Sequence, residues 1–152
     1  MNDTTRPTVL SDFPVIIQLP IQWGDQDAFG HVNNTVPIRW FESARIAYIE
    51  QSGMLHLLSG SGLGPILASI TCHYRKQLTY PDAIFVGARI TRLGRSSMTM
   101  AHAVYSQSQE AIAADGDSVV VVFDYDTNRP QRMPDELRAA IEKLEGRRFE
   151  TK

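Results

Sequence analysis

The sequence has little of three things: cysteine, long apolar runs and excess charge of either sign. One cysteine in 152 residues excludes an intrachain disulfide. The longest apolar run, Val119 to Phe123, is far too short to cross a bilayer. The polar first residues are not followed by the apolar run of a secretion signal. These absences predict a cytoplasmic protein that has no membrane partner.

The near balance of charge excludes another class of partner. A formal net charge of −2 argues against a general binder of nucleic acid or of anionic membranes, because both need a basic surface. An apolar content of 43% and a charged content of 21% are typical of a soluble globular protein. Since no linker, internal repeat or low-complexity tract interrupts the chain, we expect a single domain with a sizeable core.

Histidine, cysteine and acidic residues show no spacing that resembles a metal site. Asp25, Asp27 and His31 carry suitable donor atoms, but we predict that they hold no metal. Cys72 is expected to be a small buried residue. Because adjacent residues of a strand point to opposite faces, His73 cannot form a catalytic dyad with it.

Hydrophobic periodicity predicts a strand, a long helix, four more strands and a last helix. Residues 13–23 alternate with period two and carry Pro14 and Pro20, which favour an edge strand. Residues 35–52 have the apolar spacing of a helix that ends at Gly53. Later elements are expected at residues 66–80, 83–92, 96–113, 117–126 and about 134–145. Parallel βαβ repeats are absent, so we predict an α+β fold with an antiparallel sheet.

Three local features of this pattern are specific predictions. The alternation in residues 66–80 places Ile66 and Ile70 on one face of their strand. Asp115-Gly116 predicts a hairpin turn between the last two strands. On the long helix, Arg45 is expected on the polar side, away from the apolar stripe.

The loop of residues 24–34 has the densest group of acid, imidazole and amide side chains. It runs directly into the long helix, whose first N–H groups are free and whose dipole favours negative charge at that end. Asp27 is the leading candidate for a catalytic carboxylate, although an aspartate in a loop is commonly a turn residue. His31 is placed to orient water or to polarise a carbonyl. Asp25 is expected to accept backbone N–H bonds within the loop.

Backbone groups at the helix start are the second part of this candidate site. The N–H groups of Val32, Asn33 and Asn34 lie where an oxyanion would be held, so we count these residues as substrate-binding or catalytic. The side chains of Asn33 and Asn34 have a simpler interpretation as a turn residue and a helix cap.

A cationic stretch lies in the sheet region. It contains Arg89, Arg92 and Arg95, followed by Ser96 and Ser97. Most such runs are solvated faces, but arginine is suited to bidentate contact with phosphate. The stretch is therefore a candidate dock for a phosphorylated part of a ligand.

The stretch W-G-D-Q-D-A-F-G-H-V-N-N, with the aromatic-rich helix that ends A-R-I-A-Y-I, resembles the hotdog-fold acyl-CoA thioesterases. Within that group it is similar to the branch related to 4-hydroxybenzoyl-CoA thioesterase. The similarity continues through H-Y-R-K-Q-L-T-Y-P-D and R-L-G-R-S-S and covers most of the chain. The resemblance implies an α+β hotdog fold over residues 1–152, in which one long helix is wrapped by a curved antiparallel sheet of about five strands.

The resemblance also implies roles for single residues. The second aspartate of the motif, Asp27, corresponds to the catalytic carboxylate, and the oxyanion donor corresponds to a backbone N–H near Asn34. In the branch that resembles plant acyl-carrier-protein thioesterases, a histidine at the position of His31 contributes, together with an asparagine where this chain has Phe29. Basic residues near R-L-G-R-S-S, here Arg95 and Ser96, are implied to meet CoA phosphates. Homodimers with joined sheets, often paired into homotetramers, are implied as well.

The sequence therefore predicts hydrolysis of an acyl-CoA thioester to free acid and CoA, without a cofactor. Asp27 is the general base or the nucleophile, and the residues alone leave both open. One alternative is a protein on the same fold that binds acyl-CoA or acyl carrier without catalysis. A second alternative is a hotdog dehydratase, although the H-V-N-N loop does not resemble the motif of that group.

Overall fold

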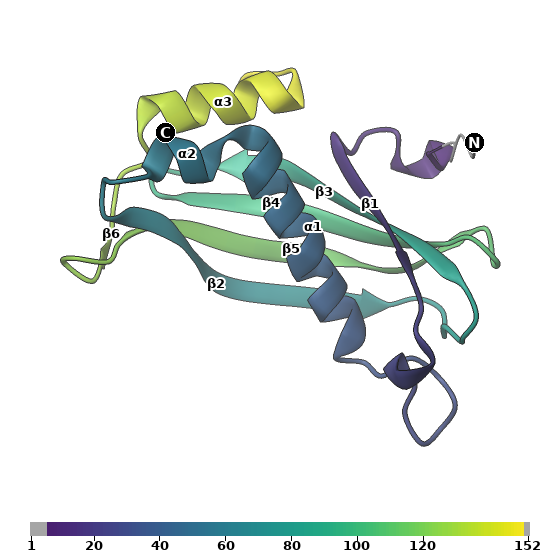
Figure 1. The fold of residues 1–152 in the computed structure, drawn as a ribbon. Coiled ribbons are helices and arrows are strands. Elements are labelled where there is room, and N and C mark those ends of the chain that lie inside the picture. Colours follow the sequence, from purple (N-terminus) through teal and green to yellow (C-terminus); the bar gives the residue numbers. More distant parts are fainter. Residues whose placement is uncertain (1–5, 151–152) are drawn as a thin grey trace.

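The computed structural model describes residues 6–150, in which a long helix lies against one face of an antiparallel sheet (Figure 1). The helix is α1 (Val36–Ser52), and a short helix, α2 (Met54–Leu58), follows it. The last helix is α3 (Asp135–Glu145). The strands are β1 (Val15–Pro20), β2 (Leu63–Tyr74), β3 (Ala83–Leu93), β4 (Ser97–Ser106), β5 (Ala111–Asp124) and β6 (Arg129–Pro130). Two single 3-10 turns are η1 (Thr8–Leu10) and η2 (Trp23–Asp25).

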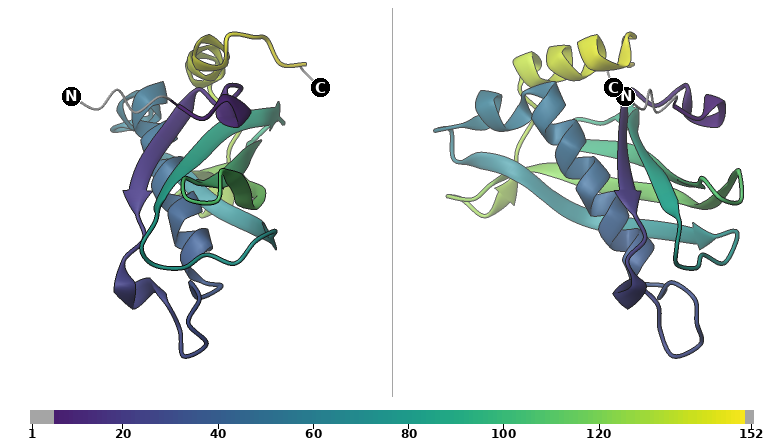
Figure 2. Two further views of the ribbon diagram at one scale, coloured as in Figure 1. Left: turned by 90° about the vertical axis from the view of Figure 1, so that its right-hand side faces the viewer. Right: turned by 45° about the vertical axis from the view of Figure 1, so that its right-hand side comes forward.

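The strand order is β1-β3-β4-β5-β2, with the two-residue β6 beside β5. All pairs are antiparallel, and β1 and β2 form the two edges. The edge position predicted for the first strand is therefore confirmed. The sheet curls around α1, and the loop of residues 24–34 projects beyond the end of the sheet (Figure 2). This α+β arrangement, with one helix wrapped by a curved antiparallel sheet, confirms the predicted fold class.

The main core lies between α1 and the sheet. Phe41, Ala44 and Tyr48 of α1 have no exposed surface and pack with Val86 and Met100 from the central strands. Fully burying a large apolar side chain such as Phe41 contributes about 1.5–3 kcal/mol, so this contact is a substantial part of the stability of the fold. A smaller second cluster forms where η1 meets the sheet. Its buried residues are Leu10, Phe85 and Ala103.

The boundaries of α1 are close to the predicted ones. Gly53 adopts φ 77° and ends the helix, as expected from its sequence position. Arg39 and Glu42 are exposed, whereas Arg45 is 7% exposed and lies in the core. The prediction that Arg45 occupies the polar side was wrong, because the sheet wraps far enough around α1 to cover that position.

The hairpin turn predicted at Asp115-Gly116 was wrong. Both residues lie inside β5, and the chain reverses direction between β4 and β5, where Glu110 has a positive φ of 52°. A Cβ atom on Gly116 would lie 1.8 Å from the carbonyl oxygen of Thr71 on the neighbouring β2. Glycine is present here because the two backbones approach closely, which is a known reason for glycine inside a strand.

The faces predicted for β2 were also wrong. The pairing of β2 with β5 shifts by one residue between Leu67 and Ser69, which marks a β-bulge. Ile66 lies opposite Val121 and Ile70 lies opposite Ser118, and these partners are an odd number of residues apart. Ile66 and Ile70 therefore point to opposite faces, because an extra residue reverses the alternation.

Candidate active site

The loop between β1 and α1 folds back on itself as a small hairpin. The N–H of Asp27 donates to the carbonyl of His31 (2.9 Å), and the N–H of Asn33 donates to the carbonyl of Asp25 (2.9 Å). At the tip, Gly30 has φ 81°, a left-handed conformation that glycine adopts at little cost. These local bonds fix Asp27 and His31 on neighbouring segments of one turn.

Each of the two aspartates of the loop accepts a hydrogen bond from a backbone N–H. Oδ2 of Asp25 accepts from Gln22 (2.8 Å), which confirms the structural role predicted for Asp25. Oδ1 of Asp27 accepts from Phe29 (2.9 Å). Within residues 6–150, Oδ2 of Asp27 accepts no hydrogen bond. The half-buried Asp27 carboxylate thus has one oxygen engaged in the turn and one available for chemistry.

Asn33 fixes the turn that leads into α1. Oδ1 of Asn33 accepts both the N–H (2.9 Å) and the hydroxyl (2.8 Å) of Thr35, and the carbonyl of Asn33 accepts the N–H of Val36 (3.0 Å). In the part of the chain that the structure describes, the N–H of Asn34 donates to no acceptor. This N–H is thus a free donor at the positive end of the helix dipole.

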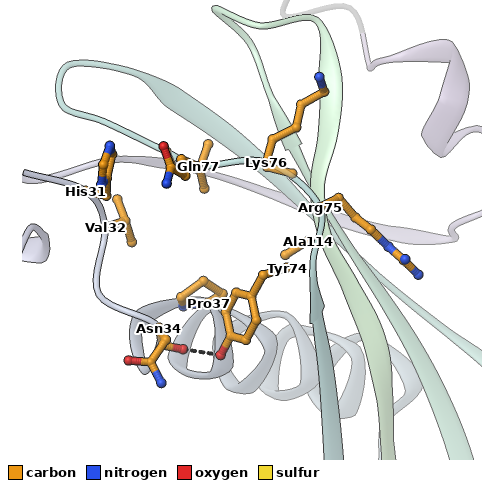
Figure 3. A pocket seen from close by; sticks show the side chains of 11 residues that line it. His31, Val32, Asn34, Pro37, Tyr74, Arg75, Lys76, Gln77 and Ala114 are labelled. Carbon is orange, nitrogen blue, oxygen red and sulfur yellow. Dashed lines mark hydrogen bonds between the residues drawn. The ribbon is translucent and has the colours of Figure 1, made fainter. Parts of the chain in front are cut away.

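A cavity of about 210 Å³ adjoins the helix start (Figure 3). Its wall on the loop side contains His31, Val32 and Asn34. The opposite wall is the end of β2 and the segment after it, from which the Tyr74 ring points toward Asn34. The Tyr74 hydroxyl donates to the carbonyl oxygen of Asn34 and holds this residue from across the cavity.

The predicted site residues are only partly brought together. His31, Val32 and Asn34 line the cavity, whereas Asp27 and Asn33 belong to the same loop but are not part of the cavity wall. Arg95 and Ser96 form the turn between β3 and β4, at the other end of the sheet.

The separation of Arg95 and Ser96 from the cavity follows from the strand register. β4 begins at Ser97, directly after this turn. Val104 lies seven positions further along β4, opposite the cavity residue Ala114. At the usual rise of a strand this spacing corresponds to about 23 Å. Within one chain, the site predicted for the CoA phosphates and the helix start are therefore two separate places.

The sequence analysis did not identify the cavity wall that lies opposite the loop. This wall contains Tyr74, which is the last residue of β2, and Arg75 and Lys76, which follow it directly. Arg75 points away from Tyr74 and forms a salt bridge with Asp115 (3.1 Å), whereas the backbone of Lys76 donates to Ala113. Only the motif H-Y-R-K-Q-L marked this segment, and no local signal shows that it faces the loop 40 residues earlier.

A second group of polar side chains lies in the core under the middle of α1. Nε2 of His102 is 2.7 Å from the hydroxyl of Ser118, and the imidazole stacks on Phe41 with ring centroids 4.8 Å apart. Burial, together with the nearby charge of Arg45, lowers the pKa of His102 to about 4. Burial also lowers the pKa of Arg45, whose Nη1 has no hydrogen-bond partner among the described residues.

The described residues contain neither a metal-binding cluster nor a membrane-spanning helix. No group of three histidine, cysteine or acidic side chains in residues 6–150 is arranged to hold a metal ion. In the same range, no helix has both the length and the apolar character needed to cross a membrane.

A comparison with protein families gives a match to the thioesterase-like superfamily over residues 21–141. The match begins directly after β1 and includes the loop, α1, the strands from β2 to β6, and most of α3. The chain belongs to the thioesterase-like superfamily. The hotdog fold and a hydrolase of the thioesterase type, both implied by the sequence motif, are confirmed at this level.

Solved and curated relatives agree with this assignment. A thioesterase from Thermus thermophilus, solved with coenzyme A and Zn, is 34% identical, with a TM-score of 0.80 over 91% of this chain and 99% of that one. The long-chain acyl-CoA thioesterase FadM of Escherichia coli is 20% identical over 84% of this chain and 96% of its own length. The uncharacterized protein YsmA of Bacillus subtilis is 26% identical over 59% of this chain, and the match spans 60% of its length.

Proposed function

We propose that this thioesterase-family protein hydrolyses acyl-CoA thioesters at the start of α1, in the manner of the branch related to 4-hydroxybenzoyl-CoA thioesterase. The observation that carries the proposal is the free N–H of Asn34, which lies at a helix N-terminus beside a cavity. A donor of this kind stabilises the oxyanion that forms when a thioester carbonyl is attacked. The relatives of known or assigned activity support thioester chemistry.

Asp27 supplies the second part of the reaction. In the general-base route, its free oxygen takes a proton from water, and the water oxygen attacks the carbonyl carbon. The C–S bond then breaks, and CoA leaves as a thiolate that takes up the proton. In the covalent route, the Asp27 carboxylate attacks the carbon directly, CoA leaves, and water hydrolyses the resulting anhydride. Both routes give one carboxylic acid and one CoA.

His31 and Asn34 position the reacting groups. His31 lines the cavity, and its backbone carbonyl accepts the N–H of Asp27, so its side chain is carried by the same turn as the carboxylate. We assign it to orient the water or the thioester. The N–H groups of Val32 and Asn33 donate to the carbonyls of Leu78 (2.8 Å) and Asp25 (2.9 Å), so they are not the oxyanion donors that we predicted from the sequence. Val32 lines the cavity wall, and Asn33 supports the turn behind it.

A second copy of the chain completes the site in our proposal. Among residues 6–150, no strand pairs with the outer edge of β2, and Ile66 and Leu67 on this strand are 38% and 43% exposed. Long exposed edges favour pairing with another strand. Joining two sheets there gives a homodimer, and two dimers give the homotetramer expected from the resemblance. Arg95 and Ser96 of one copy then serve the CoA phosphates of a site in another.

The test measures release of free thiol from acyl-CoAs with short, long and aromatic acyl groups. We compare the wild-type protein with Asp27→Asn, which keeps the oxygen that accepts the Phe29 N–H. Asp25→Asn is the matched control, because it changes a neighbouring carboxylate whose role is structural. Turnover that is lost in Asp27→Asn and kept in Asp25→Asn supports the proposal. Tight acyl-CoA binding without turnover in any of the three proteins indicates a binding protein instead.

A further inference from the structure

The loop of residues 24–34 projects beyond the end of the sheet, so pairing with the main strands does not set its position (Figure 2). Hydrogen bonds inside the loop, such as that from the Asp27 N–H to the His31 carbonyl, fix its shape. Bonds of this kind do not attach it to the rest of the molecule. The place of the loop relative to α1 therefore depends on its bonds to other segments.

The segment of residues 75–82, which joins β2 to β3, makes two of these bonds. Its Leu78 carbonyl accepts the N–H of Val32 (2.8 Å). The N–H of Tyr80 donates to Oε1 of Gln26 (3.1 Å). Because the first residues of this segment form the opposite wall of the cavity, both bonds connect the loop to that wall.

Gln26 is the residue that makes such a bond with its side chain. It pairs with Val32 in an isolated bridge across the loop hairpin. Gln26 is extended (φ −81°, ψ 146°), so its side chain and that of the next residue, Asp27, leave the backbone in opposite directions. The half-buried Gln26 amide can therefore hold Tyr80 without occupying the free oxygen of the Asp27 carboxylate.

The position of the loop decides where the Asp27 carboxylate lies. Oδ1 of Asp27 accepts the N–H of Phe29 in the same loop, so the carboxylate moves together with the loop. The bond from Tyr80 to Gln26 begins one residue before Asp27 and restrains the backbone beside the carboxylate. A displacement of about 1 Å between reacting groups can lower a rate about 100-fold, so this restraint matters for catalysis.

We propose that Gln26 is a positioning residue for thioester hydrolysis. Its side-chain amide fixes the loop against residues 75–82 and thereby holds the Asp27 carboxylate in place relative to the N–H of Asn34. Gln26 acts through Asp27 and takes no part in the bonds that form and break. This role rests on the proposed function, because it concerns the same reaction at the same site.

The first test compares the kinetics of Gln26→Met and Gln26→Glu with wild type. Methionine has a similar length but no oxygen acceptor, whereas glutamate keeps an oxygen at the same reach. Gln18→Met makes the same exchange at an exposed position of β1 and is the matched control. With the best acyl-CoA, we expect Gln26→Met to lower kcat about 10-fold with KM nearly unchanged. Gln26→Glu should restore kcat to within about 3-fold of wild type, and Gln18→Met should match wild type.

The second test is amide hydrogen exchange, which reports on the loop without turnover. Loss of the Gln26 acceptor leaves the Tyr80 N–H without its partner and loosens the loop. We expect residues 24–34 and the Tyr80 N–H to exchange about 10-fold faster in Gln26→Met, with α1 and the central strands unchanged.

The outcomes separate the role of Gln26 from the proposed function. If kcat is equal in wild type and Gln26→Met, or if Gln26→Glu recovers no activity, Gln26 is not a positioning residue. A rise in KM without a fall in kcat also overturns the role, because it indicates contact with the substrate. If wild type releases no thiol, the proposed function fails, and hydrogen exchange decides whether Gln26 fixes the loop. Equal exchange in wild type and Gln26→Met then overturns the proposal, and faster exchange confined to the loop and residues 75–82 supports it.

Discussion

Polar side chains meet α1 in two places, at its first turn and under its middle, and their surroundings differ. At the first turn, the loop of residues 24–34 is partly exposed, and the N–H of Asn34 and one oxygen of Asp27 have no acceptor or donor among the described residues. Under the middle, His102 is 2% exposed, bonded to Ser118 and stacked on Phe41.

The difference shows that a shifted pKa is not by itself the mark of a catalytic residue. The shift of His102 follows from burial in a packed core, where its neutral form is favoured. Its Nε2 is engaged by the hydroxyl of Ser118, and its ring serves as a packing surface for Phe41. The loop, in contrast, offers free donors and acceptors beside a cavity, and catalysis needs such free groups. The following predictions, in order of expected effect, test this division between function and structure.

The largest effect is expected from Asp27→Asn. We expect kcat for the best acyl-CoA to fall about 100- to 10,000-fold, because the carboxylate that takes the proton or attacks the carbonyl is lost. Chemical unfolding should change by no more than about 0.5 kcal/mol, because asparagine keeps the bond to Phe29. If the variant lost activity only because it unfolded, its free energy of unfolding would fall by several kcal/mol. That result would mean that Asp27 only shapes the loop.

The next largest effect is the acid sensitivity that His102 creates. Its folded pKa of about 4 is below the unfolded value of about 6.5, so the folded state binds fewer protons between these values. Stability contributed by the neutral ring is complete above pH 6.5 and is lost as the pH falls toward 4, by on the order of 3 kcal/mol. Urea unfolding across this range should show the loss in wild type and a flatter profile in His102→Gln. Parallel profiles would show that other groups cause the acid sensitivity.

Tyr74→Phe is expected to have a smaller and purely kinetic effect. The variant removes only the hydroxyl that holds the Asn34 carbonyl across the cavity. A loosened oxyanion donor should lower kcat about 10-fold, with KM nearly unchanged and the melting temperature within a few degrees of wild type. Tyr125→Phe, which removes a hydroxyl bonded to Pro65 on another part of β2, is the control. Equal kinetics in the two variants would remove Tyr74 from the site.

The smallest effect on stability and activity is expected from Arg45→Met. The buried guanidinium has an Nη1 without a partner, and desolvation of its charge opposes folding. An apolar side chain of similar length is expected to leave stability unchanged or to raise it by about 1 kcal/mol, as measured by urea unfolding. Thiol release should stay as in wild type. A loss of more than about 2 kcal/mol would show that Arg45 has an acceptor in the assembled protein.

Much of the fold could be predicted from the sequence because its signals are local. The apolar spacing of α1 and the glycine at its end depend on residues within a few turns of each other. The prolines around β1 predicted an edge because a missing N–H is a property of one residue. The same local reasoning failed at Gly116, where dipeptide preference indicated a turn but close approach of β2 required glycine in a strand.

Part of the candidate site could also be predicted from the sequence, and part could not. The hypothesis that Asp27, His31 and the backbone near Asn34 form a site came from spacing, since a loop that enters a helix leaves free N–H groups. Tyr74 was missed because its contact with Asn34 joins residues 40 positions apart. The bulge that sets the faces of β2 has no sequence signal either, and it depends on pairing with β5.

The sequence by itself determined the fold class and the long helix, and it indicated the loop that we propose as the site of chemistry. These follow from periodicity and from hydrogen bonds between near neighbours, which act within one segment. Only the tertiary structure decided that Arg45 is buried, that Tyr74 holds Asn34, and that Arg147 lies beside the end of β3. Each of these contacts depends on strand register and on the curvature of the sheet around α1. Register and curvature are set by the summed packing of the whole core and not by any single stretch of sequence.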